Sequence, residues 1–207
     1  MTYVDFAAVY TDRPCFTERE VRLAFPGFGD RQLHHWQRKG YVERLRKPWY
    51  RIAKRPWSQF ERWTVANRVY APSYISMESA LSYHGFIPEG VFHITSVTTL
   101  HTREFDIGKT RYHYRNVKPG YFYGYDILEH EGAAVRMADA EKTLLDLLYL
   151  NARHRTADDF EALRLDRVGI RGALRPDVFA DYLTLADNKA LVQRAKSFML
   201  WLHDHAR

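Results

Sequence analysis

Positive charge is concentrated in one short stretch of this sequence, residues 31–55. The stretch holds nine of the 31 Lys and Arg residues and one of the 25 Asp and Glu residues, so its formal charge is +8, whereas the whole chain carries +6. The remaining residues, with 22 basic and 24 acidic side chains, are slightly acidic. Such a cluster attracts a phosphate backbone because binding releases condensed counterions. The stretch therefore predicts a nucleic-acid-binding surface, and the alternative is a solvated basic hairpin.

Three predicted helices and a hairpin would hold these cations in place. Apolar spacing and turn residues predict the helices and then two short strands, over residues 3–10, 17–25, 30–40, 41–45 and 49–52. Thr17 and Glu20 match a capping box, and Gly40 suits a left-handed helix end. This order of elements is that of a winged helix-turn-helix, whose third helix enters the major groove while the hairpin contacts the backbone.

The third predicted helix has an apolar side and a polar side. At 100° per residue, Leu33, Trp36 and Gln37 are expected to face inward. The opposite side carries cations and hydrogen-bond donors, and residues 31–39 include no acid. The candidate DNA-binding residues of this helix and the hairpin are Arg31, Gln32, His34, His35, Arg38, Lys39, Arg44, Arg46, Lys47 and Arg51.

These candidates divide by the part of DNA they suit. Arg31 and Arg38 could read guanine bidentately and Gln32 could read adenine. Lys39, with Arg46 and Lys47 of the hairpin turn, would contact phosphates and position the protein. Winged helices also dock proteins, and that alternative stays open at this point.

The rest of the sequence predicts a connecting helix and then a mixed domain. Residues 57–70 have helical spacing, and Ser76 is expected to cap a further helix that ends at Gly85. Period-two patterns predict four or five strands in meander order, over 92–99, 103–107, 111–117, 121–125 and 133–137. Helices are predicted over 138–150, 176–186 and 189–203.

These elements predict an α+β protein. A winged helix-turn-helix (residues 1–55) is followed by a connecting helix (56–71) and by an α/β domain (72–207) with a mostly antiparallel sheet and C-terminal helices. No apolar run is long enough to span a bilayer, the N-terminus lacks the order of a signal peptide, and Cys15 is the single cysteine. We therefore expect a cytoplasmic protein without a membrane partner.

Other chemistry is less well supported by the residues. Four carboxylates with Lys142 could suggest a metal-dependent nuclease targeted by the winged helix, namely Asp126, Asp139, Glu141 and Asp146. Glu141 and Asp146 are five apart on a helix, so a solvated helix face is the favoured interpretation. The histidines show no zinc-ligand spacing, and no nucleotide-binding or nucleophile motif occurs. We expect no enzyme activity, no metal and no cofactor.

Two long motifs resemble a known family. The segment Pro72-Ser73-Tyr74-Ile75-Ser76-Met77-Glu78-Ser79-Ala80-Leu81 is similar to the Pro-Ser-Tyr-Ile-Ser-x-Glu-Ser-Ala-Leu signature of AbiEi-type antitoxins. The strand residues 94–98 and the helix Ala138-Asp139-Ala140-Glu141-Lys142-Thr143-Leu144-Leu145-Asp146-Leu147-Leu148-Tyr149 are similar to that family too. The resemblance covers nearly the whole chain up to about residue 152, including a winged helix at the N-terminus.

The resemblance implies the antitoxin of a type IV toxin–antitoxin system. Such a protein binds its own promoter DNA, often at inverted repeats, and represses its operon. Its partner would be a nucleotidyltransferase-like toxin encoded beside it, often countered without a stable complex. The DNA-reading role maps onto the third predicted helix, whereas no antitoxin site can be mapped residue by residue. A protein-interaction adaptor that holds the toxin directly is an alternative.

Overall fold

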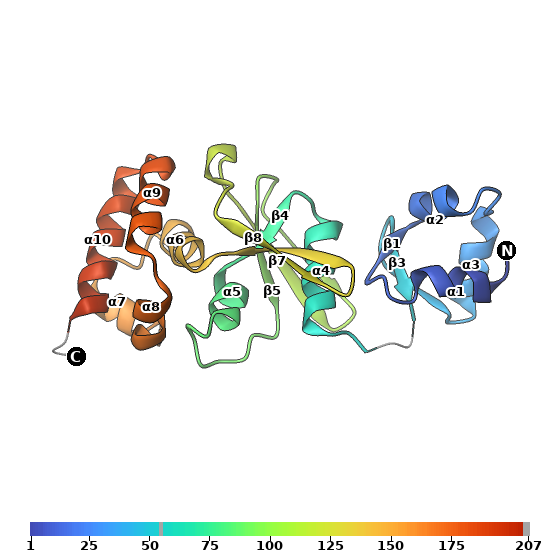
Figure 1. Ribbon diagram of the computed structural model, residues 1–207, viewed down its shortest axis with the longest axis horizontal. Coiled ribbons are helices and arrows are strands. Elements are labelled where there is room, and N and C mark those ends of the chain that lie inside the picture. The colour runs from blue at the N-terminus through green and yellow to red at the C-terminus, as the bar shows by residue number, and fades with distance from the viewer. Residues whose placement is uncertain (54–55, 205–207) are drawn as a thin grey trace.

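The computed structural model describes residues 1–53 and 56–204, with Asp30 described by its backbone alone. The molecule is elongated (Figure 1). Small helices and a small sheet lie at one end, a six-stranded sheet lies in the middle, and a group of helices forms the other end. The fold is a mixed α and β fold, in agreement with the predicted class at this level.

The N-terminal unit (residues 3–52) contains three helices and a three-stranded antiparallel sheet of order β1-β3-β2. Its elements are α1 (Tyr3–Tyr10), β1 (Phe16–Thr17), α2 (Glu18–Ala24), α3 (Asp30–Arg38), β2 (Val42–Arg46) and β3 (Trp49–Ile52). The three predicted helices and the hairpin are confirmed. The capping box is confirmed as well, because Thr17 Oγ1 accepts from the Glu20 amide at 3.2 Å and Glu20 Oε2 accepts from the Thr17 amide at 2.5 Å.

Aromatic rings fill the core of this unit. The Trp36 ring of α3 packs 4.7 Å from Phe6 and 5.7 Å from Phe28, measured between ring centroids. The buried apolar residues are Phe6, Tyr10, Phe16, Val21, Phe28, Leu33, Trp36, Val42 and Tyr50. The predicted inward positions of Leu33 and Trp36 are therefore confirmed, but Gln37 is exposed, which contradicts its prediction.

The central sheet has six strands in the order β6-β7-β5-β4-β9-β8. The strands are β4 (Ser73–Ile75), β5 (Ile94–Thr98), β6 (Arg103–Ile107), β7 (Thr110–Asn116), β8 (Tyr125–His130) and β9 (Ala133–Ala138). The β4–β9 and β5–β7 pairs are parallel and the other three pairs are antiparallel, so the sheet is mixed. The predicted meander order is wrong: β5 pairs with β7 instead of with β6, and β4, which was not predicted, lies between β5 and β9.

The predicted strand over residues 121–125 is also wrong. A 3-10 turn, η1 (Pro119–Tyr121), occupies its start, and Gly124 then adopts a φ of +73°. A Cβ atom at Gly124 would lie 2.7 Å from the Tyr182 ring and 3.0 Å from the Lys142 side chain. The chain turns here because Tyr121 and its neighbours pack into the core.

Helices flank and extend the central sheet. α4 (Gln59–Val69) and α5 (Met77–Tyr83) lie beside it, and α6 (Ala140–Leu150) lies between it and the C-terminal helices (Figure 1). Those helices are α7 (Ala157–Glu161), α8 (Arg167–Ala173), α9 (Pro176–Ala186) and α10 (Lys189–His203). The helices predicted for 57–70, 138–150, 176–186 and 189–203 are confirmed, whereas the short α7 and α8 were not predicted. None of the described helices has the length and hydropathy needed to cross a membrane.

Arg68 of α4 joins the N-terminal unit to the rest of the molecule. Its guanidinium donates to the Cys15 carbonyl at 2.7 Å, pairs with Glu20 and lies 4.9 Å from the Trp49 ring centroid. Cys15 itself is fully buried at this junction, and burial raises the pKa of its thiol to about 12, so the thiol stays protonated.

Replacing Arg68 tests this junction. We expect Arg68→Ala to lower the free energy of unfolding by about 1–3 kcal/mol, because charged hydrogen bonds to partly buried acceptors are lost. Urea unfolding followed by circular dichroism measures the change. Arg22→Ala is the control, since Arg22 forms an exposed i,i+4 pair with Glu18 and should cost less than about 0.5 kcal/mol. Equal losses for the two variants would contradict the proposed role of Arg68.

Candidate nucleic-acid interface

The α3 helix is held by one side and presents the other to solvent. Leu33 and Trp36 are buried in the aromatic core. Five polar residues of the helix and its C-cap are exposed, namely Arg31, His34, His35, Arg38 and Lys39. The helix ends in a closed cap, because Gly40 has a φ of +69° and the Tyr41 amide donates to the Trp36 carbonyl at 3.0 Å. Cations and imidazoles therefore share the outward side of a firmly seated helix.

Gln32 differs from its neighbours on α3. Its side chain is half-buried, and Nε2 donates to the Met1 carbonyl at 2.7 Å. This hydrogen bond links the start of α3 to Met1, two residues before α1 begins. The amide group that was predicted to read adenine is thus already engaged within the chain.

The hairpin separates the remaining candidates into two groups. Arg44 and Lys47 are exposed. Arg46 is half-buried, with its guanidinium carbon 4.2 Å from the Phe105 ring centroid of β6. Arg51 is only 8% exposed, pairs with Glu43 at 2.9 Å and lies 4.5 Å from the Trp57 ring centroid. Two of the predicted DNA-binding cations, Arg46 and Arg51, are therefore occupied by contacts within the protein.

Charge counting alone could not separate these two groups. Neighbouring strand residues point to opposite faces of a hairpin, and one face of this hairpin is turned toward Trp57 and Phe105. The sequence feature that could have predicted these cation–π contacts is the presence of aromatic residues after the basic hairpin. Lys54 and Arg55, which were counted in the basic stretch, lie outside the described residues.

A second polar cluster lies inside the molecule, on α6. The favoured interpretation of its carboxylates as a solvated helix face is wrong, because residues 141–148 are all buried. α6 packs against α5 and α9 as well as against α10, so no side of its middle faces solvent. Only Asp126 of the four predicted carboxylates is exposed, and it lies on β8, apart from the others.

Lys142 and Asp146 form an ion pair at the centre of this cluster, and both side chains are fully buried. Tyr74 of β4 completes it: its hydroxyl accepts from Lys142 Nζ at 2.8 Å and donates to Asp146 Oδ2 at 3.0 Å. Ser76 Oγ donates to the same carboxylate oxygen at 2.7 Å, and Lys142 Nζ lies 3.7 Å from the Tyr121 ring centroid. Burial lowers the pKa of Lys142, although Asp146 opposes that shift, and burial together with Asp146 raises the pKa of Tyr74.

Ser76 therefore does not cap its helix as predicted. It occupies the N-cap position of α5, but its side chain makes no cap hydrogen bond and turns to Asp146 instead. Glu78 in the first turn accepts from Thr95 Oγ1 at 3.0 Å. The two motifs that resemble the antitoxin family thus contact each other through Tyr74, Ser76, Lys142 and Asp146.

The start of α6 holds the C-terminal helices through two further carboxylates. Glu141 accepts from the Arg175 amide at 2.6 Å and from Arg175 Nη2 at 2.7 Å. Asp139 accepts from the Lys142 amide at 2.7 Å and from the Tyr182 hydroxyl at 2.7 Å. Burial by itself would raise the pKa of Glu141, but the hydrogen bonds from Arg175 outweigh it and lower that pKa. These carboxylates act as hydrogen-bond acceptors that fix α9.

Two of the histidines at the central sheet lie close together. The ring centroids of His93 and His113 lie 5.2 Å apart, and His113 Nδ1 is 3.6 Å from Glu104. Across residues 1–53 and 56–204, no three His, Cys, Asp or Glu side chains are placed to hold a metal ion. His205 lies outside the described residues.

No protein-family model matches this chain, and no curated protein matches it in sequence.

The buried ion pair can be tested by removing one partner and then both. Lys142→Met should lower the free energy of unfolding by about 3–5 kcal/mol, because Asp146 loses its counter-charge in a fully buried site. Lys142→Met/Asp146→Leu should recover part of that loss, since no buried charge remains. Chemical denaturation of the three proteins measures both steps. A loss below about 1 kcal/mol for Lys142→Met would show that Asp146 does not depend on this partner.

Proposed function

We propose that the protein binds double-stranded DNA sequence-specifically through its N-terminal unit, which acts as a winged helix-turn-helix. The observation that carries this proposal is the outward side of α3, where Arg31, His35 and Arg38 are exposed together while Trp36 anchors the opposite side. The order of α1, α2, α3 and the hairpin supports it.

The dimensions of α3 suit a major groove. Arg31 and Arg38 are seven residues apart, so their Cα atoms lie about 10 Å apart along the helix axis. That length covers about three base pairs at 3.4 Å each, which is the span that one recognition helix reads. Lys47 at the hairpin tip is exposed and would contact a phosphate beside the groove.

The uneven charge of the chain favours this end of the molecule. The basic stretch is confined to residues 31–55, whereas the rest of the chain is slightly acidic. DNA would therefore be attracted to α3 and the hairpin, and weakly repelled elsewhere. Arg46 and Arg51 would hold the hairpin against Phe105 and Trp57 rather than bind DNA.

The wider role that we propose is that of an antitoxin which represses its own promoter, in a type IV toxin–antitoxin system. Support comes from the resemblance of two motifs, in residues 72–81 and 138–149, to AbiEi-type antitoxins. Residues 1–55 would read paired half-sites, residues 56–71 would connect, and residues 72–207 would counter a nucleotidyltransferase-like toxin, with or without a stable complex. Repression would work by excluding the polymerase and would need no catalysis or cofactor.

A band-shift titration on DNA from upstream of the gene tests the reading surface. Arg31→Ala and Arg38→Ala should each weaken specific binding by about 1–3 kcal/mol and relax sequence preference, since each removes a bidentate base contact. Lys47→Ala should weaken all sequences alike and reduce the salt slope by about one unit. Lys189→Ala is the control, because this exposed lysine of α10 lies far from α3. Unchanged affinity with Arg31 and Arg38 both replaced would overturn the assignment of α3.

The antitoxin role has its own test, which separates the two halves of the chain. Cells carry a reporter behind the protein's promoter and also express the neighbouring gene product. We expect Arg31→Ala/Arg38→Ala to release the reporter but still to protect the cells from the toxin. Loss of both properties together would mean that protection acts only through repression. A neighbouring product that is harmless without this protein would remove the antitoxin proposal.

A further inference from the structure

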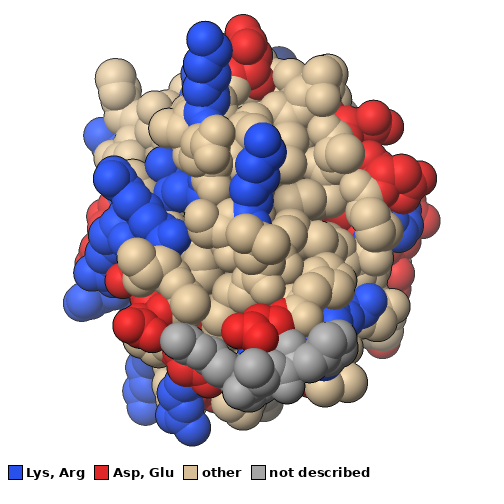
Figure 2. Space-filling view, turned by 90° about the vertical axis from the view of Figure 1, so that its left-hand side faces the viewer, with Lys and Arg blue, Asp and Glu red and all other residues tan. Residues whose placement is uncertain are grey.

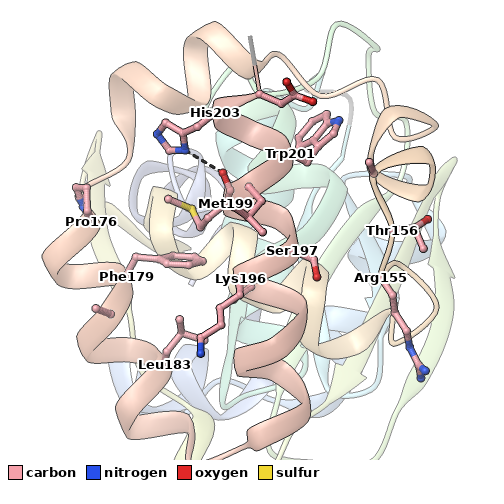
Figure 3. Close-up of a pocket in the computed structure, with 15 residues that line it drawn as sticks. Arg155, Thr156, Pro176, Phe179, Leu183, Lys196, Ser197, Met199, Trp201 and His203 are labelled. Carbon is pink, nitrogen blue, oxygen red and sulfur yellow. Dashed lines mark hydrogen bonds between the residues drawn. The ribbon is translucent and has the colours of Figure 1, made fainter. Parts of the chain in front are cut away.

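The end of the molecule opposite to α3 carries an apolar hollow. It lies along α10, between α9 on one side and the residues that precede α7 on the other, and its volume is about 1120 Å³. Figure 3 shows Phe179 and Leu183 of α9 pointing toward Met199 and Lys196 of α10, with Arg155 and Thr156 across the helix. We call this surface the end face.

The end face has few charged side chains and includes an exposed leucine. Figure 2 shows it as a mainly uncharged surface from which individual Lys or Arg side chains project, with the acidic side chains toward its edges. Leu200 of α10 lines the hollow and is 76% exposed, among the highest values for any large apolar side chain of the described residues. An apolar hollow next to an exposed apolar side chain can pack against the same surface of another copy, because each copy supplies both parts.

The two helices of the end face have opposite charge. α9 contains Asp177 and Asp181, both exposed, and no Lys or Arg. α10 contains no acid, and its exposed cations include Lys189 and Lys196. In Figure 3, Lys196 lies beside Phe179 and Leu183. Asp181 stands between these two residues in the sequence of α9, so its backbone lies at a similar level along the helix axis. Within the described part of the chain, neither Asp181 nor Lys196 forms an ion pair.

We propose that the end face binds a second copy of this chain, about a two-fold axis that runs between α9 and α10 and parallel to them. This rotation keeps every residue at its own level and lays α10 of one copy over α9 of the other. Lys196 then faces Asp181 of the other copy, and the symmetry makes this pair twice. Leu200 packs at the level of Pro176 and Ala180 in the hollow of its neighbour.

The size of the end face sets the strength of this contact. α10 has 15 residues and is therefore about 22 Å long, and two adjacent helices are about 20 Å wide. A surface of these dimensions falls below the roughly 800 Å² per partner that stable complexes bury. The dimer should therefore be weak and reversible, and it should form without DNA, so it does not depend on the proposed DNA binding.

Sedimentation equilibrium of the full chain over a dilution series tests the proposal. We expect a monomer–dimer equilibrium. Leu200→Glu should raise the dissociation constant of the dimer about tenfold or more, because a charged side chain replaces the apolar one that packs in the hollow. Leu23→Glu is the matched control: Leu23 is an exposed leucine of α2, which lies at the opposite end of the molecule from the end face, so its replacement should leave the equilibrium unchanged. A chain that stays monomeric throughout, or that is weakened equally by both variants, overturns the proposal.

Charge reversal identifies the axis independently of Leu200. Asp181→Lys and Lys196→Glu should each weaken the homodimer, since each places like charges opposite one another twice. An equimolar mixture of the two variants should dimerise again, because in the mixed dimer both pairs join opposite charges: one is the original Asp181–Lys196 pair and the other has its charges exchanged. These substitutions lie on exposed helix surface and should leave the circular dichroism spectrum intact. A mixture that associates no better than either variant alone rules out this two-fold arrangement. If the hollow binds only a small apolar molecule, or only another protein, the proposal is overturned as well.

Discussion

The burial of Trp36 against the aromatic rings of the N-terminal unit determines which side of α3 faces solvent. Trp36 and Leu33 are the inward residues of the stretch 31–39, whose other residues are cations, imidazoles and amides. With that side packed on Phe6 and Phe28, Arg31, His35 and Arg38 must lie together on the outside. The proposed DNA contact therefore depends on an apolar interaction, and the charged residues contribute affinity and specificity only because that interaction orients them.

The larger part of the molecule is organised differently, around a buried polar cluster. Tyr74 of β4 and Ser76, which directly follows that strand, meet Lys142 and Asp146 of α6, and these buried groups hydrogen-bond to one another. Glu141 and Asp139 extend the cluster to Arg175 and Tyr182, so the same helix also fixes α9. Through α9 the cluster sets the position of the end face, at the opposite end of the molecule from α3 (Figure 1).

Local signals predicted the helices well, including the capping box at Thr17 and the long helices from α6 onward. They failed where long-range contacts decide the structure. β4 has only three residues, too few to show a period, yet it occupies the middle of the sheet and sets the strand order. Lys142 and Asp146 are four residues apart, a spacing that places them on one helix face, but the sequence does not show that α6 is covered on all sides. In the candidate site, exposure of Arg31 and Arg38 followed from helix periodicity, whereas the engagement of Arg46 and Arg51 by Phe105 and Trp57 depended on how the hairpin packs.

The most direct measurement of DNA reading is a nuclear magnetic resonance titration of the intact protein with a duplex from upstream of its gene, with backbone and arginine side-chain signals followed together. Insertion of α3 into the major groove predicts that the largest shifts fall on Arg31, His35 and Arg38, with smaller shifts at Lys47 and none in α9 or α10. Shifts that cluster on the central sheet or the C-terminal helices and leave α3 unchanged would contradict the proposal.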